Sequence, residues 1–203
     1  MNESTREDER HNEKMRKHKA ARDKIMATKT IEKGLLIVHT GAGKGKTTAA
    51  MGMVCRAMGH GQRVAIIQFI KGAWATGEKA IFDAFPNQVT MRAMGEGFTW
   101  ETQDRKRDMY MARAAWDTAK SYIGDLDYRM VVCDELNIAL RYGYLPLDEV
   151  LATLKDRPAD KHVIITGRNA REELIEIADL VTEMTLIKHP FKSGVKAQEG
   201  IEF

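Results

Sequence analysis

Short runs of apolar and β-branched residues recur along the chain from residue 35 onward, and segments of helical periodicity separate them. We expect strands at residues 35–38, 63–70, 89–94, 128–135, 162–166 and 180–187. We expect helices at residues 49–58, 77–85, 147–155 and 170–178, and a longer helix that ends at Tyr122 and is capped by Thr99 or Thr102. Strands that alternate with helices imply right-handed crossovers, and therefore a mostly parallel sheet with helices on both faces.

The first 33 residues have a different pattern. They hold ten Lys or Arg and seven Asp or Glu, with almost no large apolar residue before Ile25. We expect residues 1–12 to be disordered, and residues 13–26, where good helix formers dominate, to be helical. Two interpretations of this arm stay open, a solvated basic tail and a helix that orders on a partner or ligand. The predicted organisation is an arm at residues 1–33 and one domain at residues 34–203.

Composition limits the classes of protein that fit. A chain of 203 residues with 43% hydrophobic content can form one domain with a substantial core. A net charge of +3 does not indicate a nucleic-acid partner. Cys55 and Cys133 form neither a disulfide framework nor a metal motif, as expected of buried thiols in a reducing cytoplasm. We find no signal peptide and no apolar run of membrane-spanning length, so we expect a cytoplasmic protein without a membrane partner.

The first predicted strand leads directly into a glycine-rich turn, and a predicted helix follows it. The turn comprises Gly41, Ala42, Gly43, Lys44, Gly45, Lys46, Thr47 and Thr48. A strand, a glycine loop and a helix in this order form the phosphate cradle of P-loop proteins, in which backbone N–H groups bind an anion. Lys46 is expected to reach phosphate oxygens, and the Thr47 hydroxyl to bind Mg²⁺. The predicted fold class is therefore α/β, with a P-loop NTPase-like (RecA-like) sheet and an N-terminal helical arm.

The loop departs from the usual motif at two positions. Thr40 stands where the first glycine is usual, and Lys44 is a second lysine inside the loop. These departures leave open how a nucleotide lies in the cradle.

Paired carboxylates end the fourth predicted strand, which is the form of a Walker B element. Asp134 or Glu135 is expected to hold the magnesium ion that Thr47 also binds, and Mn²⁺ could replace it. Arg168 follows the fifth strand, and the carboxyl ends of parallel strands face the ligand crevice.

The cradle and the carboxylates predict a nucleoside triphosphate site but not its reaction. A GTPase would carry an Asn-Lys-x-Asp motif, and the chain has none. An ATPase could use Glu135 as a base, and a transferase could hold the triphosphate as a leaving group. The residues alone do not rank these two classes.

Several segments resemble the P-loop family of ATP:corrinoid adenosyltransferases. They run in order from about Gly34 to Phe203, at residues 40–50, 59–61, 68–72, 97–102, 132–136, 144–147, 163–168, 188–191 and 194–198. Phe-Thr-Trp-Glu-Thr at residues 98–102 and Val-Lys-Ala-Gln at residues 195–198 are not general P-loop features, so the resemblance is specific.

The resemblance implies transfer of the 5′-deoxyadenosyl group of ATP to cobalt(I) of a reduced corrinoid, such as cobalamin, with release of inorganic triphosphate. It implies a triphosphate reversed relative to ordinary P-loop enzymes, which fits Thr40 and Lys44. Cobalt(I) is then the nucleophile, so the protein positions the substrates and neutralises charge on the triphosphate. Lys46 and Thr47 would serve this catalytic role, and Arg56 and Arg168 are candidate further ligands of phosphate or ribose. A surface or structural role is the alternative for both arginines.

On the corrinoid side, Phe98 and Trp100 match the family's aromatic residues that displace the lower axial ligand of cobalt. Two core aromatics are the alternative interpretation. The resemblance also implies a homodimer in which the N-terminal helix covers the corrinoid, so residues 13–26 are a candidate lid, and reduced flavodoxin serves the family as electron donor. His18 and His39 are not expected to bind cobalt, because an axial histidine would oppose the reduction.

Two other functions compete with this one. A P-loop ATPase switch could bind a protein or nucleic acid through the arm, and a corrinoid carrier could use ATP for stability alone.

Overall fold

The computed structural model describes residues 3–70, 76–95 and 104–202. The chain divides into two units, residues 1–32 and residues 33–203. The first unit is one helix, α1 (Glu3–Ala27). The prediction of disorder at residues 1–12 is therefore wrong for residues 3–12. This segment has no Gly or Pro, and Lys24 in the last turn of α1 complements the helix dipole.

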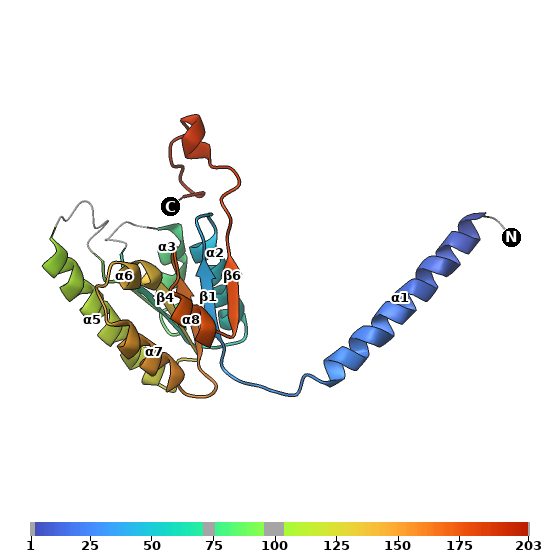
Figure 1. Cartoon of the computed structure of the whole chain (residues 1–203), viewed down its shortest axis with the longest axis horizontal. Coiled ribbons are helices and arrows are strands. Elements are labelled where there is room, and N and C mark those ends of the chain that lie inside the picture. Colours follow the sequence, from blue (N-terminus) through green and yellow to red (C-terminus); the bar gives the residue numbers. More distant parts are fainter. Residues whose placement is uncertain (1–2, 71–75, 96–103, 203) are drawn as a thin grey trace. The chain divides into compact units, whose positions relative to one another are not determined.

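The second unit is built on a six-stranded sheet (Figure 1). Its strands are β1 (Leu36–Thr40), β2 (Val64–Gln68), β3 (Val89–Ala93), β4 (Met130–Asp134), β5 (His162–Thr166) and β6 (Leu180–Glu183). The order is β3-β2-β4-β5-β1-β6, and every neighbouring pair is parallel. The predicted α/β fold with a parallel sheet is confirmed. Strand β5 lies between β1 and β4, so the glycine loop and the paired carboxylates approach the same edge across one intervening strand.

Helices cover both faces of the sheet, as predicted. They are α2 (Lys46–Gly59), α3 (Gly77–Asp83), α5 (Arg105–Gly124), α6 (Leu136–Arg141), α7 (Leu147–Lys155) and α8 (Glu172–Ile177). A 3₁₀ helix, η1 (Pro190–Ser193), lies in the C-terminal segment and has no buried residue. Alternate strand residues face the two layers. Ile66 packs in one core with Val54 of α2, whereas Ile67 packs in the other with Trp116 of α5. None of the helices that the structure describes has the length and apolarity needed to span a membrane.

Three elements differ from the predictions. Strand β6 ends at Glu183 instead of residue 187, because its partner β1 ends at Thr40 and the Met184 carbonyl accepts from the Gly43 N–H of the glycine loop at 2.6 Å. Helix α6 was not predicted, since its six residues directly follow the carboxylate pair. Asp104 caps α5 by accepting from the N–H groups of Lys106 and Arg107. The proposed caps Thr99 and Thr102 lie outside the described residues.

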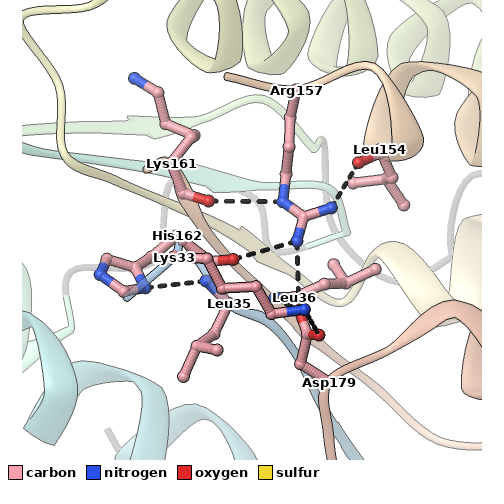
Figure 2. Close-up of polar contacts among 9 residues, drawn as sticks. Lys33, Leu35, Leu36, Leu154, Arg157, Lys161, His162 and Asp179 are labelled. Carbon is pink, nitrogen blue, oxygen red and sulfur yellow. Dashed lines mark hydrogen bonds and ion pairs between the residues drawn. The ribbon is translucent and has the colours of Figure 1, made fainter. Parts of the chain in front are cut away.

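A polar cluster fixes the point where the chain enters β1 (Figure 2). Arg157 lies at its centre and donates to the carbonyls of Leu154, Lys161 and Gly34 and to the Asp179 carboxylate. Asp179 also accepts from the Leu36 N–H at 2.9 Å and pairs with Lys33. These contacts satisfy backbone groups at the amino end of β1, the end opposite the glycine loop, and so set the register of the strand that carries the loop.

Candidate active site

The glycine loop joins β1 to α2 and is closed on one side by the segment that follows β6. Gly41 and Gly43 are buried, and a Cβ at either would lie 2.5 or 2.7 Å from the Met184 carbonyl oxygen. The Gly43 N–H donates to that same oxygen at 2.6 Å. Two of the loop's glycines are therefore required by a close backbone approach, a reason that the motif alone did not reveal.

Lys46 is buried at the start of α2, with 7% of its surface exposed. Its Nζ donates to the carbonyl oxygens of Gly41, at 2.9 Å, and Gly43. Burial lowers the pKa of Lys46, and the negative charges of Glu135 and Asp134 partly oppose this. A phosphate oxygen would offer this ammonium group a charged acceptor in place of neutral carbonyls, which makes a stronger hydrogen bond.

The Asp134 carboxylate lies beside the loop, at the end of β4, and is fully buried. Its Oδ1 accepts from the hydroxyl groups of Thr47, at 2.8 Å, and Thr166, at 2.7 Å. Its Oδ2 accepts from Nε2 of Gln68 at 3.0 Å. The structure therefore brings the predicted residues Thr47 and Asp134 into direct contact.

Glu135 follows in the left-handed region, with φ 64°, and its N–H donates to the Thr166 hydroxyl at 2.9 Å. Its side chain is half-buried, and its Oε2 would lie 3.0 Å from a Cβ placed on Gly167. Gly167, with φ +125°, therefore leaves the space next to the Glu135 carboxylate. A non-glycine residue held at positive φ is a strained conformation that is often found at functional sites.

Oxygen donors dominate this site, and that suits a hard cation. Among the residues that the structure describes, no group of three or more His, Cys, Asp or Glu side chains could hold a metal ion. Mg²⁺ fits such a site, because it usually takes one or two protein oxygens and completes its shell with water and phosphate.

The remaining predicted residues lie at different places. Lys44 is exposed and pairs with Glu202 of the C-terminal segment. Arg168 is exposed, and its charge contributes to the lowered pKa of Lys46, so it lies near the loop. Arg56 is exposed in the last turn of α2, about 15 Å along the helix from Lys46, so the structure does not bring it to the loop. Exposed Ala42 and Thr48 and half-buried Gly45 complete the turn, and Phe98 and Trp100 lie outside the described residues.

Three buried polar residues at this edge were missed as site residues. Gln68 ends β2, Thr166 ends β5 and His39 precedes the last residue of β1. Burial lowers the pKa of His39, and neither ring nitrogen has a hydrogen-bond partner within the described part of the chain. The signal that could have found Gln68 and Thr166 is their place at the carboxyl ends of parallel strands, the rule that singled out Arg168.

Comparison with known proteins gives two family matches. Residues 32–203 match the family described as ATP:corrinoid adenosyltransferase BtuR/CobO/CobP, and residues 1–26 match the model described as Cob(I)alamin adenosyltransferase N terminal. A solved structure, domain III of the Thermotoga maritima replication initiation protein DnaA, covers 73% of this chain and 53% of that chain at 14% identity and a TM-score of 0.37. A TM-score this low does not establish a shared fold, so the fold is described from its own strand order.

Three relatives are similar over nearly their full length, and each is named a corrinoid adenosyltransferase. The protein from Pseudomonas aeruginosa is 56% identical over 203 residues, which is 100% of both chains. The protein from Sinorhizobium sp is 58% identical over 98% of this chain and 94% of its own. The protein from Escherichia coli K12 is 44% identical over 97% of this chain and 99% of its own. With the glycine loop, the buried lysine and the paired carboxylates in place, this chain belongs to the ATP:corrinoid adenosyltransferase family.

Proposed function

We propose that this enzyme, which transfers the adenosyl group of ATP to cob(I)alamin, holds the triphosphate of ATP in the loop at residues 41–48 and releases it as inorganic triphosphate. The observation that carries the proposal is the buried Lys46 ammonium group, whose hydrogen-bond acceptors are loop carbonyls. The contact between Thr47 and Asp134 next to it supports a metal-assisted phosphate site. The family match supports ATP and a corrinoid as the two substrates.

The proposed metal is Mg²⁺, with Mn²⁺ as a substitute, and Thr47 and Glu135 would hold it. Both oxygens of Asp134 accept hydrogen bonds from protein donors, so we assign Asp134 an indirect role through Thr47. A bound Mg²⁺ would neutralise charge on the phosphate oxygens. Lys46 and the loop N–H groups would do the same from the protein side, with Lys44 and Arg168 nearby.

In the proposed reaction the protein supplies no nucleophile. The electron pair of cobalt(I) forms the bond to C5′ of ATP, and the C5′–O bond breaks with its electrons on the departing triphosphate. The site residues stabilise this charge and keep the triphosphate in place, so their contribution is positioning and electrostatics. In this proposal, Arg56 contacts the nucleotide only at a part that is remote from Lys46.

The corrinoid side of the proposal depends on residues that the structure does not describe or places in a separate unit. We propose that Phe98 and Trp100 displace the lower axial ligand of cobalt. We further propose that residues 13–26 of α1 cover the corrinoid in a homodimer, that reduced flavodoxin delivers the electron, and that the enzyme works in the cytoplasm. The match of residues 1–26 to a cobalamin adenosyltransferase N-terminal model supports a corrinoid-related role for the arm.

Substitution of Lys46 tests the site. Lys46→Met should weaken ATP binding and lower kcat/KM by at least about 100-fold, in the range seen when a single charge-stabilising group is removed. The matched control is Lys79→Met, because Lys79 pairs with Asp83 on the surface of α3, away from the loop. We expect the control to keep both properties. Unchanged ATP binding by calorimetry in Lys46→Met would refute the proposal that this loop holds the triphosphate.

A further inference from the structure

Four buried polar side chains form a row across the sheet beneath the start of α2. Gln68 of β2 is in register with Asp134 of β4, and Thr166 of β5 is in register with His39 of β1. On each of these strands, the residue two positions before the polar one lies on the same face. That residue is apolar and belongs to the core on the α2 side of the sheet. Each of the four is at most 4% exposed. Because the core would otherwise continue with apolar residues at this level, the row is a feature that folding alone does not require.

The hydrogen bonds along the row have a direction that converges on Asp134. Oδ1 accepts hydrogen bonds from the hydroxyl groups of Thr47 and Thr166, and Oδ2 accepts one from the side-chain amide of Gln68. A hydroxyl that donates to a carboxylate keeps its oxygen lone pairs for another partner, such as a cation. The orientation of Thr47 therefore depends on where the Asp134 carboxylate points.

Gln68 donates to Oδ2, the oxygen of Asp134 that neither threonine hydroxyl contacts. Without it, Oδ2 of the fully buried Asp134 carboxylate would lose a hydrogen bond. The carboxylate could then turn to share the two hydroxyl donors between its oxygens, and Thr47 would turn with it. Thr166 is less free to turn, because its oxygen also accepts a hydrogen bond from the Glu135 N–H.

We infer that Gln68 is a positioning residue of the proposed metal site, which holds Asp134 so that Thr47 presents its oxygen to Mg²⁺. This inference rests on the proposed role of Thr47 as a metal ligand. Gln68 touches neither metal nor nucleotide in this account, and it acts through Asp134.

The test measures how strongly Mg²⁺ tightens ATP binding, using calorimetry on the full chain without corrinoid, at saturating Mg²⁺ and with chelator. Gln68→Met, which keeps the length of the side chain, should reduce the Mg²⁺-dependent tightening by about 10-fold, the usual effect of losing a residue that orients a metal ligand. Gln88→Met is the matched control, because the half-buried Gln88 amide makes a similar bond, to the Met58 carbonyl at 3.1 Å, next to the other end of α2. It should leave the tightening unchanged.

A second variant excludes a merely structural effect. In Gln68→Glu the new carboxyl group can donate to Oδ2 only while protonated, and its position beside a buried carboxylate favours the protonated form. The Mg²⁺-dependent tightening should be close to that of the wild type at pH 6 and fall as the pH rises, whereas the wild type should show no such fall. A tightening that does not change with pH in this variant would overturn the inference.

Thr47→Ala separates the two proposals. If Thr47→Ala loses the tightening and Gln68→Met keeps it, the inference about Gln68 is wrong and the metal site stands. If Thr47→Ala keeps the tightening, the metal site itself is wrong, and the inference falls with it.

Discussion

Gly167 is the residue whose replacement should disturb the site most directly without removing a functional group. Its φ is +125°, and a Cβ would lie 2.9 Å from Cβ of Asn137 and 3.0 Å from Oε2 of Glu135. Gly167→Ala should lower the free energy of unfolding by about 1–3 kcal/mol, because alanine is strained at this φ. Gly52→Ala is the control, since a Cβ there meets nothing within 4 Å and helix propensity favours alanine. Denaturant unfolding of both variants checks this, and equal stability of the two would contradict it.

His39 should make the stability of the folded protein depend on pH. Burial lowers its pKa below the usual 6.5, so the folded protein favours the neutral ring while the unfolded chain binds a proton more readily. The stability that depends on neutral His39 is thus fully present above about pH 6.5 and is lost as the pH falls toward the lower folded pKa. His39→Leu should reduce the loss of stability between pH 7.5 and 5.5, and replacing the exposed His60 should not. Identical pH profiles for His39→Leu and the wild type would contradict this.

At the scale of elements, the polar cluster of Figure 2 holds the amino end of β1, and with it the strand that carries the loop. Asp179→Asn should lower the free energy of unfolding at pH 7 by about 1.5–3 kcal/mol, because it weakens hydrogen bonds to a partly buried charge. Asp127→Asn is the control, since Asp127 pairs with Arg63 at an exposed site, where ion pairs contribute little.

Asp179 should also make the stability of the protein depend on pH. Its pKa is lowered by favourable contacts, whereas the pKa of His39 is lowered by burial. Burial alone would raise the pKa of Asp179, but the hydrogen bonds from Lys33 and Leu36 and the charges of Lys33 and Arg157 outweigh it and lower the pKa. Its contribution to stability is therefore present above about pH 3.9 and lost as the pH falls through the lower folded pKa. The stability difference between Asp179→Asn and the wild type should shrink in acid. A difference that is constant from pH 7 to pH 3 would contradict this.

The strands, and the placing of the glycine loop near the paired carboxylates, were predictable from the sequence for identifiable reasons. Buried parallel strands are short apolar runs, and the loop with Lys46 and the Asp134–Glu135 pair have characteristic spacings. Contacts made by backbone atoms of distant segments were not predictable. The bond from Gly43 to Met184 depends on how the chain leaves β6, just after that strand ends at Glu183. The row from Gln68 to His39 depends on strand order, which the one-dimensional pattern does not contain.

At the scale of the whole molecule, the division into two units predicts that the arm and the domain have separable roles. Removal of residues 1–32 should leave the unfolding temperature and ATP affinity of the domain nearly unchanged, because the core clusters and the loop lie within residues 33–203. The same deletion should slow adenosyl transfer to the corrinoid, since α1 is the proposed lid. Thermal unfolding, ATP calorimetry and the transfer rate check this. A truncated enzyme that transfers at the full rate would contradict the role of the arm.

In the proposed reaction, the loop around Lys46 holds a triphosphate that leaves intact when cobalt bonds to the sugar. The most direct measurement is anaerobic incubation of the enzyme with ATP, Mg²⁺ and chemically reduced cobalamin. The visible spectrum follows the cobalt–carbon bond while the phosphorus products are identified. We predict one inorganic triphosphate for each cobalt–carbon bond formed, and loss of both products together in Lys46→Met. Formation of ADP and orthophosphate without the cobalt–carbon bond, or full turnover in Lys46→Met, would contradict the account.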